Sequence, residues 1–265
     1  MASSGSGEKI FFETDGSGPP LVLLHPFPTN HKFWQALRPS LAQRFRVLTP
    51  DIRCHGASLC GAEKVTMEQH AEDLRRLLDE NRISRAIFAG VSIGGYILFE
   101  FWRRHKDRVQ ALVLSNTRPQ ADTAEGRQTR LAAVDSILQK GPAEYLDGMV
   151  PKLMGETTRR NRPDLVARAH AMMNEMSPAG IAAVLRGMAE RADSVATLKT
   201  INVPVLIIGG EEDTLTPMAD AELMHREISN SRLARIPFAG HYAPLEQPDI
   251  VLIELRKFLD SLPLA

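Results

Sequence analysis

The sequence predicts an α/β fold, in which a mostly parallel sheet is covered by helices on both faces. Short apolar, β-compatible runs alternate along the chain with longer runs of helical periodicity. The strand runs are almost continuously apolar, which is typical of strands buried on both faces of a parallel sheet. Between residues 116 and 197 the strand signal disappears, and this segment is helical in character.

The expected elements follow in chain order. Strands are expected near 9–13, 20–24, 45–49, 85–89, 109–114, 203–208 and 231–236. Helices are expected near 30–43, 66–81, 93–105, 217–228 and 246–261. We expect the N-terminal strands to form an antiparallel hairpin at one edge of the sheet.

The predicted organisation is a core with an insertion. Residues 119–197 are rich in Ala, Arg, Met and Leu, and prolines mark breaks between their helices. We expect this segment to be a helical lid (cap) inserted after the sixth strand. The core then comprises residues 8–118 and 198–265, and the Ser/Gly tail 1–7 is expected to be disordered.

The composition restricts the class of partner. Lys plus Arg and Asp plus Glu both number 32 in 265 residues, so the chain has no basic footprint for nucleic acid. No apolar run approaches the length that spans a membrane, and residues 1–7 lack the features of a signal peptide. We therefore expect a cytoplasmic protein without nucleic-acid or membrane partners; the oligomeric state cannot be predicted.

The two cysteines, Cys54 and Cys60, lie close together in one loop region. In a reducing compartment we expect them to be free thiols rather than a disulfide. Without a supporting cluster of ligands they do not indicate a zinc site, and no metal is expected.

A serine between a buried strand and a buried helix is the strongest functional signal. Ser92 is flanked by Gly90 and Gly94 in the pattern G-x-S-x-G, which also arises by chance. The glycines let the backbone approach closely while the serine Oγ stands clear of the sheet. Ser92 also precedes a helix, where free N–H groups stabilise a developing oxyanion. We interpret Ser92 as a catalytic nucleophile.

A serine nucleophile needs a histidine base and a carboxylate that orients it. Asp213 follows the expected strand 203–208, and His241 lies in the loop after the expected strand 231–236. The carboxyl ends of parallel strands meet at one edge of a sheet, so both residues are expected near Ser92.

The chain resembles the α/β-hydrolase superfamily, whose catalytic residues follow in the order Ser, Asp, His. The resemblance covers nearly the whole chain and looks most like the bacterial carboxylesterase, enol-lactonase and perhydrolase branch. It rests on five ordered motifs, at residues 25–28, 50–58, 89–95, 210–213 and 239–248. It implies a triad of Ser92, Asp213 and His241 and no organic or metal cofactor.

The resemblance also implies an oxyanion hole built from backbone N–H groups. Relatives usually carry His-Gly after the first core strand, whereas this chain has His25-Pro26. Proline has no N–H, so Phe27 is assigned as one donor and Ile93 as the other. A second departure is Cys54, which stands where relatives commonly have glycine.

Other candidates have simpler interpretations. Glu211 and Glu212 could replace Asp213, but the family pattern favours Asp213, and Asn116 stands where some relatives keep the acid. The resemblance implies loop-shaping roles for His25 and His55, whereas His31 and His170 could touch substrate. His70, His105 and His225 fall in helical stretches and are expected to be solvated or packed.

The expected activity is hydrolysis of small carboxylic esters through an acyl-enzyme. Enol-lactone hydrolysis, as in 3-oxoadipate enol-lactonases, is the first alternative, because residues 112–117 resemble that group. Perhydrolysis is a second, and a non-catalytic ligand receptor is a remote one. Haloalkane dehalogenation is disfavoured, since the nucleophile is a serine. The expected partner is a small ester or lactone, which would enter under a lid whose methionines, including Met149 and Met188, suit an adaptable apolar wall.

Overall fold

The computed structural model describes residues 9–263, so the expected tail 1–7 lies outside the described residues. Its seven strands form one sheet in the order β1-β3-β2-β4-β5-β6-β7. The strands are β1 (Phe12–Asp15), β2 (Pro20–Leu24), β3 (Arg46–Pro50), β4 (Ala86–Val91), β5 (Val109–Ser115), β6 (Val205–Gly210) and β7 (Ser231–Ile236). All neighbours are parallel except β1 and β3, which confirms the doubly wound sheet.

The N-terminal edge differs from the expected hairpin. β1 is antiparallel, but it pairs with β3 and not with β2. The turn between β1 and β2 lies against the segment that precedes β3: a Cβ on Gly16 would lie 2.2 Å from the Ala42 carbonyl oxygen. The turn between β1 and β2 therefore crosses the N-terminal end of β3, and β2 lies between β3 and β4 in the sheet.

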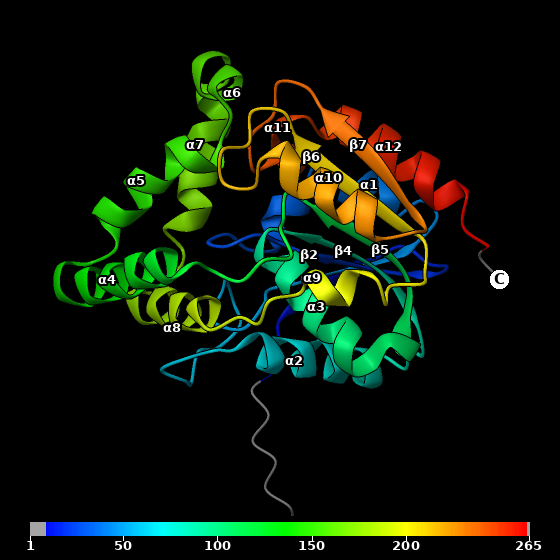
Figure 1. The fold of residues 1–265 in the computed structure, drawn as a ribbon, viewed down its shortest axis with the longest axis horizontal. Helices are drawn as coiled ribbons and strands as arrows, with labels where there is room; N and C mark the ends of the chain where they lie inside the picture. The colour runs from blue at the N-terminus through cyan, green and yellow to red at the C-terminus, as the bar shows by residue number, and fades with distance from the viewer. Residues whose placement is uncertain (1–8, 264–265) are drawn as a thin grey trace, which may run out of the picture.

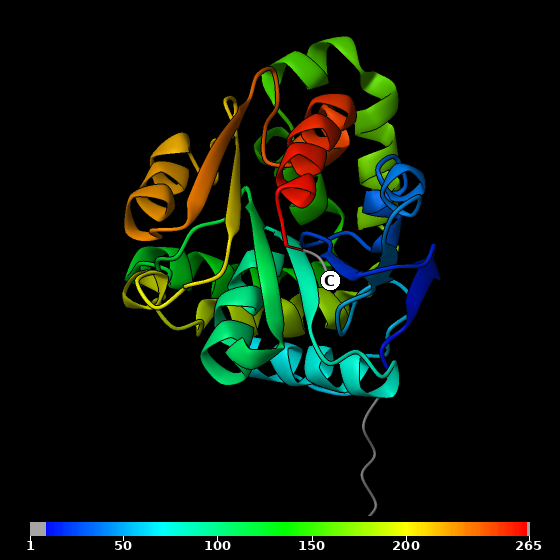
Figure 2. The same ribbon diagram turned by 90° about the vertical axis from the view of Figure 1, so that its right-hand side faces the viewer.

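The helices of the core cover both faces of the sheet. They are η1 (His31–Trp34), α1 (Arg38–Leu41), α2 (Met67–Glu80), α3 (Ile93–His105), η2 (Lys106–Arg108), α10 (Met218–Glu227), α11 (Ala243–Glu246) and α12 (Pro248–Asp260). Helices α2 and α3 pack together on one face, and α12 lies on the opposite face (Figures 1 and 2). The expected helix 30–43 is two short helices, and the expected helix 246–261 is preceded by the separate turn α11.

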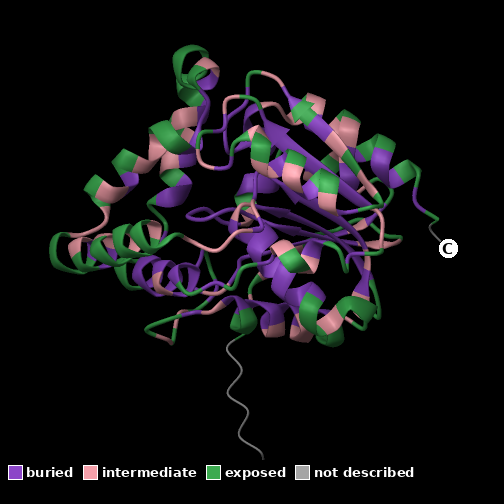
Figure 3. Cartoon of the chain, viewed as in Figure 1, coloured by how far each residue is buried: buried purple, intermediate pink, exposed green. Residues whose placement is uncertain are grey.

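Helix α2 illustrates how the sequence determines a local element. Thr66 caps its first turn in a capping box with Gln69, which satisfies two backbone N–H groups. Its buried residues recur every three or four positions, which is the spacing of one helical face: Met67, His70, Ala71, Asp73, Leu74, Leu77 and Leu78. The opposite face points to solvent, as the exposed and intermediate colours of α2 in Figure 3 indicate.

The segment between β5 and β6 is helical and forms a lobe beside the sheet (Figure 1). It contains α4 (Ala124–Lys140), α5 (Ala143–Leu153), α6 (Glu156–Asn161), α7 (Pro163–Met173), α8 (Pro178–Ala189) and α9 (Val195–Leu198). The insertion was expected after the sixth strand, but it follows β5, which is the fifth strand of the described chain. We call residues 119–197 the helical insertion.

The core of the molecule lies between the central strands and the helices on either face. Strands β4 and β6 are buried along their whole length, as the purple ribbon in Figure 3 shows. None of the helices in the described part of the chain is long and apolar enough to cross a membrane.

Candidate active site

Ser92 occupies a sharp turn between β4 and α3. Its backbone has φ +56° and ψ −115°, a conformation that non-glycine residues rarely adopt. The Ser92 N–H is shared between the carbonyl oxygens of Ser115 and Asn116, each at 3.1 Å. These bonds tie the strained turn to the end of the neighbouring strand β5.

The two glycines of the motif are required by close backbone contacts. A Cβ on Gly90 would lie 2.5 Å from the carbonyl carbon of Gly94, and a Cβ on Gly94 would lie 2.9 Å from the Leu24 carbonyl oxygen. Only glycine allows β4, α3 and β2 to approach this closely. The turn lies where the strand order reverses, between β2 and β4, which is where open α/β sheets form their binding crevice.

Asp213 and His241, two of the predicted site residues, form a buried pair. His241 Nδ1 lies 2.8 Å from Asp213 Oδ2, and both side chains are buried. Asp213 Oδ1 accepts the backbone N–H groups of Leu215 and Thr216 at 2.8 and 3.0 Å. Its Oδ2 also accepts the Thr216 hydroxyl at 2.6 Å and the Asn116 side-chain amide at 3.0 Å.

This environment keeps Asp213 ionised. Burial alone would raise the pKa of Asp213, but the charge of His241 and the hydrogen bonds from His241 and Thr216 outweigh it and lower the pKa to about 2. An ionised carboxylate on Nδ1 fixes the imidazole with its proton on Nδ1 and leaves Nε2 as a base.

The loop that carries His241 is held by a buried glutamate. Glu246 Oε1 accepts the N–H groups of Gly240 and Tyr242, which flank His241, at 3.0 and 3.1 Å. Its Oε2 accepts the N–H of Gly155 in the helical insertion at 2.9 Å. Burial raises the pKa of Glu246, and the hydrogen bonds oppose that shift. One carboxylate thus joins the histidine loop to the insertion.

Glu212 makes a second connection of this kind and is not a partner of His241. Its Oε2 accepts the Thr157 N–H at 2.8 Å, and its Oε1 accepts the Thr157 hydroxyl. Glu211 is exposed. Of the three neighbouring acids, Asp213 is therefore the one that contacts His241.

The backbone N–H groups of Phe27 and Ile93 have no acceptor within residues 9–263. Phe27 follows β2, and Ile93 is the first residue of α3, so the two groups come from adjacent strand ends. The Phe27 carbonyl accepts the buried Tyr242 hydroxyl at 3.1 Å, which holds the loop in place. Two free donors beside a serine can bind an oxyanion.

Ser92, His241 and Phe27 line one pocket of about 70 Å³. No hydrogen bond joins Ser92 to His241 within the described chain, which is common before substrate binds. The other walls come from the loops after β5 and β6, from α3 and from the insertion: Tyr96, Arg118, Arg130, Met149, Leu153, Met188, Leu215 and Thr216. Met149 and Met188 are the methionines of the helical insertion that line this pocket.

The remaining histidines have other partners. His25 donates from Nδ1 to the Pro26 carbonyl at 3.0 Å and accepts the Ile52 N–H on Nε2 at 3.1 Å, so it shapes the loop. Burial lowers the pKa of His25 to about 3, and it is neutral. His31 contacts Asp51 at 2.8 Å and His170 contacts Asp147 at 2.7 Å, and neither lines the pocket with Ser92.

The expectation of free thiols is wrong. Cys54 and Cys60 form a disulfide with a Cα–Cα distance of 4.3 Å. Cys54 has φ +67°, the left-handed conformation that favours glycine, so a cysteine departs here from the residue that the backbone favours. The turn at Cys54 brings the two side chains together across a six-residue separation.

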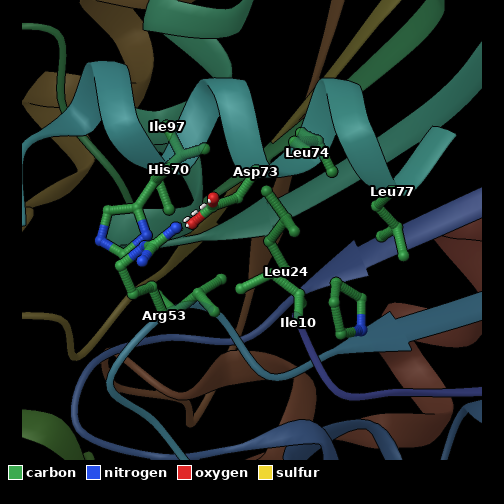
Figure 4. A pocket seen from close by; sticks show the side chains of 10 residues that line it. Ile10, Leu24, Arg53, His70, Asp73, Leu74, Leu77 and Ile97 are labelled. Atoms are coloured by element: carbon green, nitrogen blue, oxygen red, sulfur yellow. Dashed lines mark hydrogen bonds and ion pairs between the residues drawn. The ribbon is translucent and has the colours of Figure 1, made fainter. Parts of the chain in front are cut away.

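A second, smaller pocket of about 20 Å³ lies between α2 and the sheet and contains none of the predicted site residues (Figure 4). His70, Arg53 and Asp73 line it together with apolar side chains, and Arg53 is paired with Asp73 at 2.6 Å. Both ring nitrogens of His70 are buried without a hydrogen-bond partner. No group of three or more His, Cys, Asp or Glu residues in the described chain is arranged to hold a metal ion.

Sequence reasoning missed Thr216, Glu246 and Arg118 as parts of the site, and it considered Asn116 only as the position where some relatives keep the acid. Asn116 and Arg118 follow a strand at the catalytic edge, and that position was the available signal. Thr216 and Glu246 act through loop geometry that no local pattern reveals.

The comparisons with known proteins agree with this geometry. The profile described as "alpha/beta hydrolase fold" matches residues 19–248. The chain therefore belongs to the α/β-hydrolase family.

Two curated relatives and one solved structure show which members of that family the chain is similar to. The chain is 26% identical to 3-oxoadipate enol-lactonase 1 of Acinetobacter baylyi, covering 99% of this chain and 97% of the relative. It is 30% identical to pimeloyl-[acyl-carrier protein] methyl ester esterase of Aromatoleum aromaticum, covering 89% and 97%. It matches the solved structure of a thermophilic esterase from Thermogutta terrifontis (malate bound) with a TM-score of 0.93, 36% identity, and 95% and 93% coverage.

Proposed function

We propose that this α/β hydrolase is a serine hydrolase that cleaves small carboxylic esters through an acyl-enzyme intermediate. The observation that carries the proposal is the buried Asp213–His241 pair, joined over 2.8 Å, in the pocket that Ser92 also lines. Relatives named as esterases support the same chemistry.

The mechanism follows from the positions of the groups. His241 Nε2 takes the Ser92 proton while Oγ attacks the ester carbonyl, and the N–H groups of Phe27 and Ile93 bind the oxyanion. The tetrahedral intermediate collapses, the C–O bond to the alcohol breaks, and His241 returns the proton to the leaving oxygen. Water then attacks the acyl-enzyme, with His241 again as base, and the acid is released.

The helical insertion serves as the lid of this pocket. Its side chains Arg130, Met149, Leu153 and Met188 form part of the pocket wall. Glu212 and Glu246 tie its segment 155–157 to the loops of Asp213 and His241. The lid therefore shapes the space that the acyl and alcohol groups occupy.

Enol-lactone hydrolysis is the second candidate. It is favoured by the similarity to 3-oxoadipate enol-lactonase 1 along 99% of the chain. It needs the same triad, because attack on the lactone carbonyl opens the ring and gives an acyl-enzyme whose leaving group stays attached.

The test is the release of p-nitrophenol from acetate, butyrate and octanoate esters. Ser92→Ala is expected to lower kcat/KM by about 10³-fold or more, because the nucleophile is lost. Ser84→Ala, at an exposed serine before β4, is the matched control and is expected to keep the activity. Equal rates in the intact chain and in Ser92→Ala would contradict the proposal.

A further inference from the structure

Two arginines line the pocket of Ser92, and no Asp or Glu among the described residues does. Arg130 already has a carboxylate partner, since its Nε donates to Asp122 Oδ2 at 2.6 Å. Arg118 has no ion pair and no hydrogen bond within residues 9–263, and its Nε is buried. The site thus contains one guanidinium whose acceptor is missing.

The carboxylates around Arg118 are engaged elsewhere. Asp122 binds both Arg130 and Arg191, the latter at 2.7 Å. Asp220, whose charge is close enough to interact with Arg118, instead accepts a hydrogen bond from Gln120 at 3.0 Å. The Arg118 side chain is half-buried, and its Nε is the atom that is buried without an acceptor. A buried donor without an acceptor is costly, so an acceptor on a bound ligand gains the hydrogen bond that the protein itself does not make.

Arg118 is held close to the reacting atoms by its neighbour in sequence. The Thr117 hydroxyl donates to the Ser92 carbonyl oxygen at 2.8 Å, and a Cβ on Gly95 would lie 2.4 Å from that hydroxyl oxygen. Arg118 therefore begins directly beside the nucleophile turn. Its side chain can meet a group that lies only a few bonds from the scissile carbonyl.

Two further arginines lie near Arg118. Arg118 also borders a small adjoining cavity of about 10 Å³, where Arg103 and Arg191 join it, but Arg103 is paired with Glu100 and Arg191 with Asp122. Arg191 lies 4.3 Å above the ring of Tyr96, a residue that lines both spaces. Within the described residues Arg118 is therefore the arginine of this group that has no carboxylate partner, and its position favours an anion over a neutral group.

We propose that Arg118 binds a carboxylate on the acyl chain of the substrate, so that the enzyme prefers esters or lactones of short dicarboxylic acids to neutral esters. A guanidinium matches a carboxylate with two parallel N–H···O bonds, which gives both affinity and orientation. The acyl chain stays bound to Ser92 through both half-reactions, so this contact acts in both. The inference rests on the proposed ester hydrolysis.

The experiment compares two esters that differ only in this group. Monomethyl glutarate carries a terminal carboxylate where methyl pentanoate carries a methyl group, and methanol release gives kcat/KM for both. The intact chain is expected to prefer monomethyl glutarate. Arg118→Met is expected to lower its kcat/KM by about 10- to 100-fold, mainly through KM, and to leave methyl pentanoate within about twofold. Arg118→Lys keeps the charge but cannot form the two parallel hydrogen bonds of a guanidinium. Its kcat/KM for monomethyl glutarate is expected to lie between those of the intact chain and Arg118→Met.

Arg127→Met, at an exposed arginine of α4, is the matched control, and its kcat/KM is expected to stay unchanged for both esters. An equal loss on both esters in Arg118→Met, or no preference in the intact chain, would overturn the inference while the ester hydrolase remained. If the intact chain cleaves neither of these esters nor the p-nitrophenyl esters, the proposed function fails. Calorimetry with glutarate then tests the carboxylate site by itself. Binding to the intact chain that is lost in Arg118→Met supports the site, and absence of binding to the intact chain overturns it.

Discussion

Two of the pockets in the described part of the chain each contain a buried histidine, and the two histidines have opposite surroundings. In the pocket of Ser92, His241 Nδ1 is held by an ionised carboxylate at 2.8 Å. In the pocket under α2, both ring nitrogens of His70 lack a partner, although Asp73 lies in the same pocket and is paired with Arg53 (Figure 4).

This difference shows what makes a buried histidine a base. Burial without a partner lowers the pKa of His70 to about 3, because desolvation disfavours the charged ring. In the proposed mechanism, the carboxylate of Asp213 stabilises the imidazolium that forms at His241 during proton transfer. The neighbouring carboxylate and not burial therefore distinguishes the two sites.

The largest expected effect comes from making His241 resemble His70. Asp213→Asn removes the carboxylate but keeps the shape, and kcat/KM for an ester is expected to fall by about 10⁴-fold, because the ring loses its correct tautomer and its counter-charge. Steady-state kinetics measure the effect, and circular dichroism checks the fold. Asp249→Asn, an exposed carboxylate in the first turn of α12, is the control. A loss below tenfold in Asp213→Asn would mean that another residue orients His241.

A smaller effect is expected when the support of Asp213 is removed. The Asn116 side chain donates to Asp213 Oδ2 and to the Gly240 carbonyl, both at 3.0 Å. Asn116→Gly keeps its backbone, which has φ +46°, and deletes both bonds. We expect about a tenfold lower kcat/KM. Arg82→Gly replaces another residue of positive φ far from the site and is expected to leave the rate unchanged. Equal rates for both variants and the parent would show that Asn116 does not hold Asp213.

The stability of the fold at acid pH tests the buried histidines that have no carboxylate partner, such as His70. Buried His25, His55 and His70 each have a folded-state pKa lowered to about 3, against 6.5 unfolded. Between these values the unfolded chain binds more protons, so stability falls as the pH decreases from 6.5 towards 3. Each histidine contributes up to about 1.4 kcal/mol per pH unit to that slope.

His70→Leu is therefore expected to reduce the slope of the unfolding free energy against pH by about one proton and to change the stability at pH 7 by less than about 1 kcal/mol. Urea unfolding at several pH values measures the slope. His225→Leu, at an exposed position of α10, is the control. An unchanged slope in His70→Leu would indicate that water reaches the His70 ring.

The strand and helix pattern could be predicted because it depends on local periodicity. The strands after the first lie within about two residues of their expected positions, since each is a short apolar run between turn residues. The partner of β1 could not be predicted, because it depends on how the turn at Gly16 lies against residues 42–45. The Cys54–Cys60 pairing likewise depends on a positive φ at Cys54 that the residue type itself disfavours.

The sequence by itself determined which residues can meet at the catalytic edge. Gly90 and Gly94 reveal a turn where only glycine fits, and Asp213 and His241 follow parallel strands whose carboxyl ends share that edge. Only the tertiary structure decided which groups surround them. Whether a side chain such as Arg118 finds a partner depends on contacts among distant segments, and no local pattern encodes those contacts.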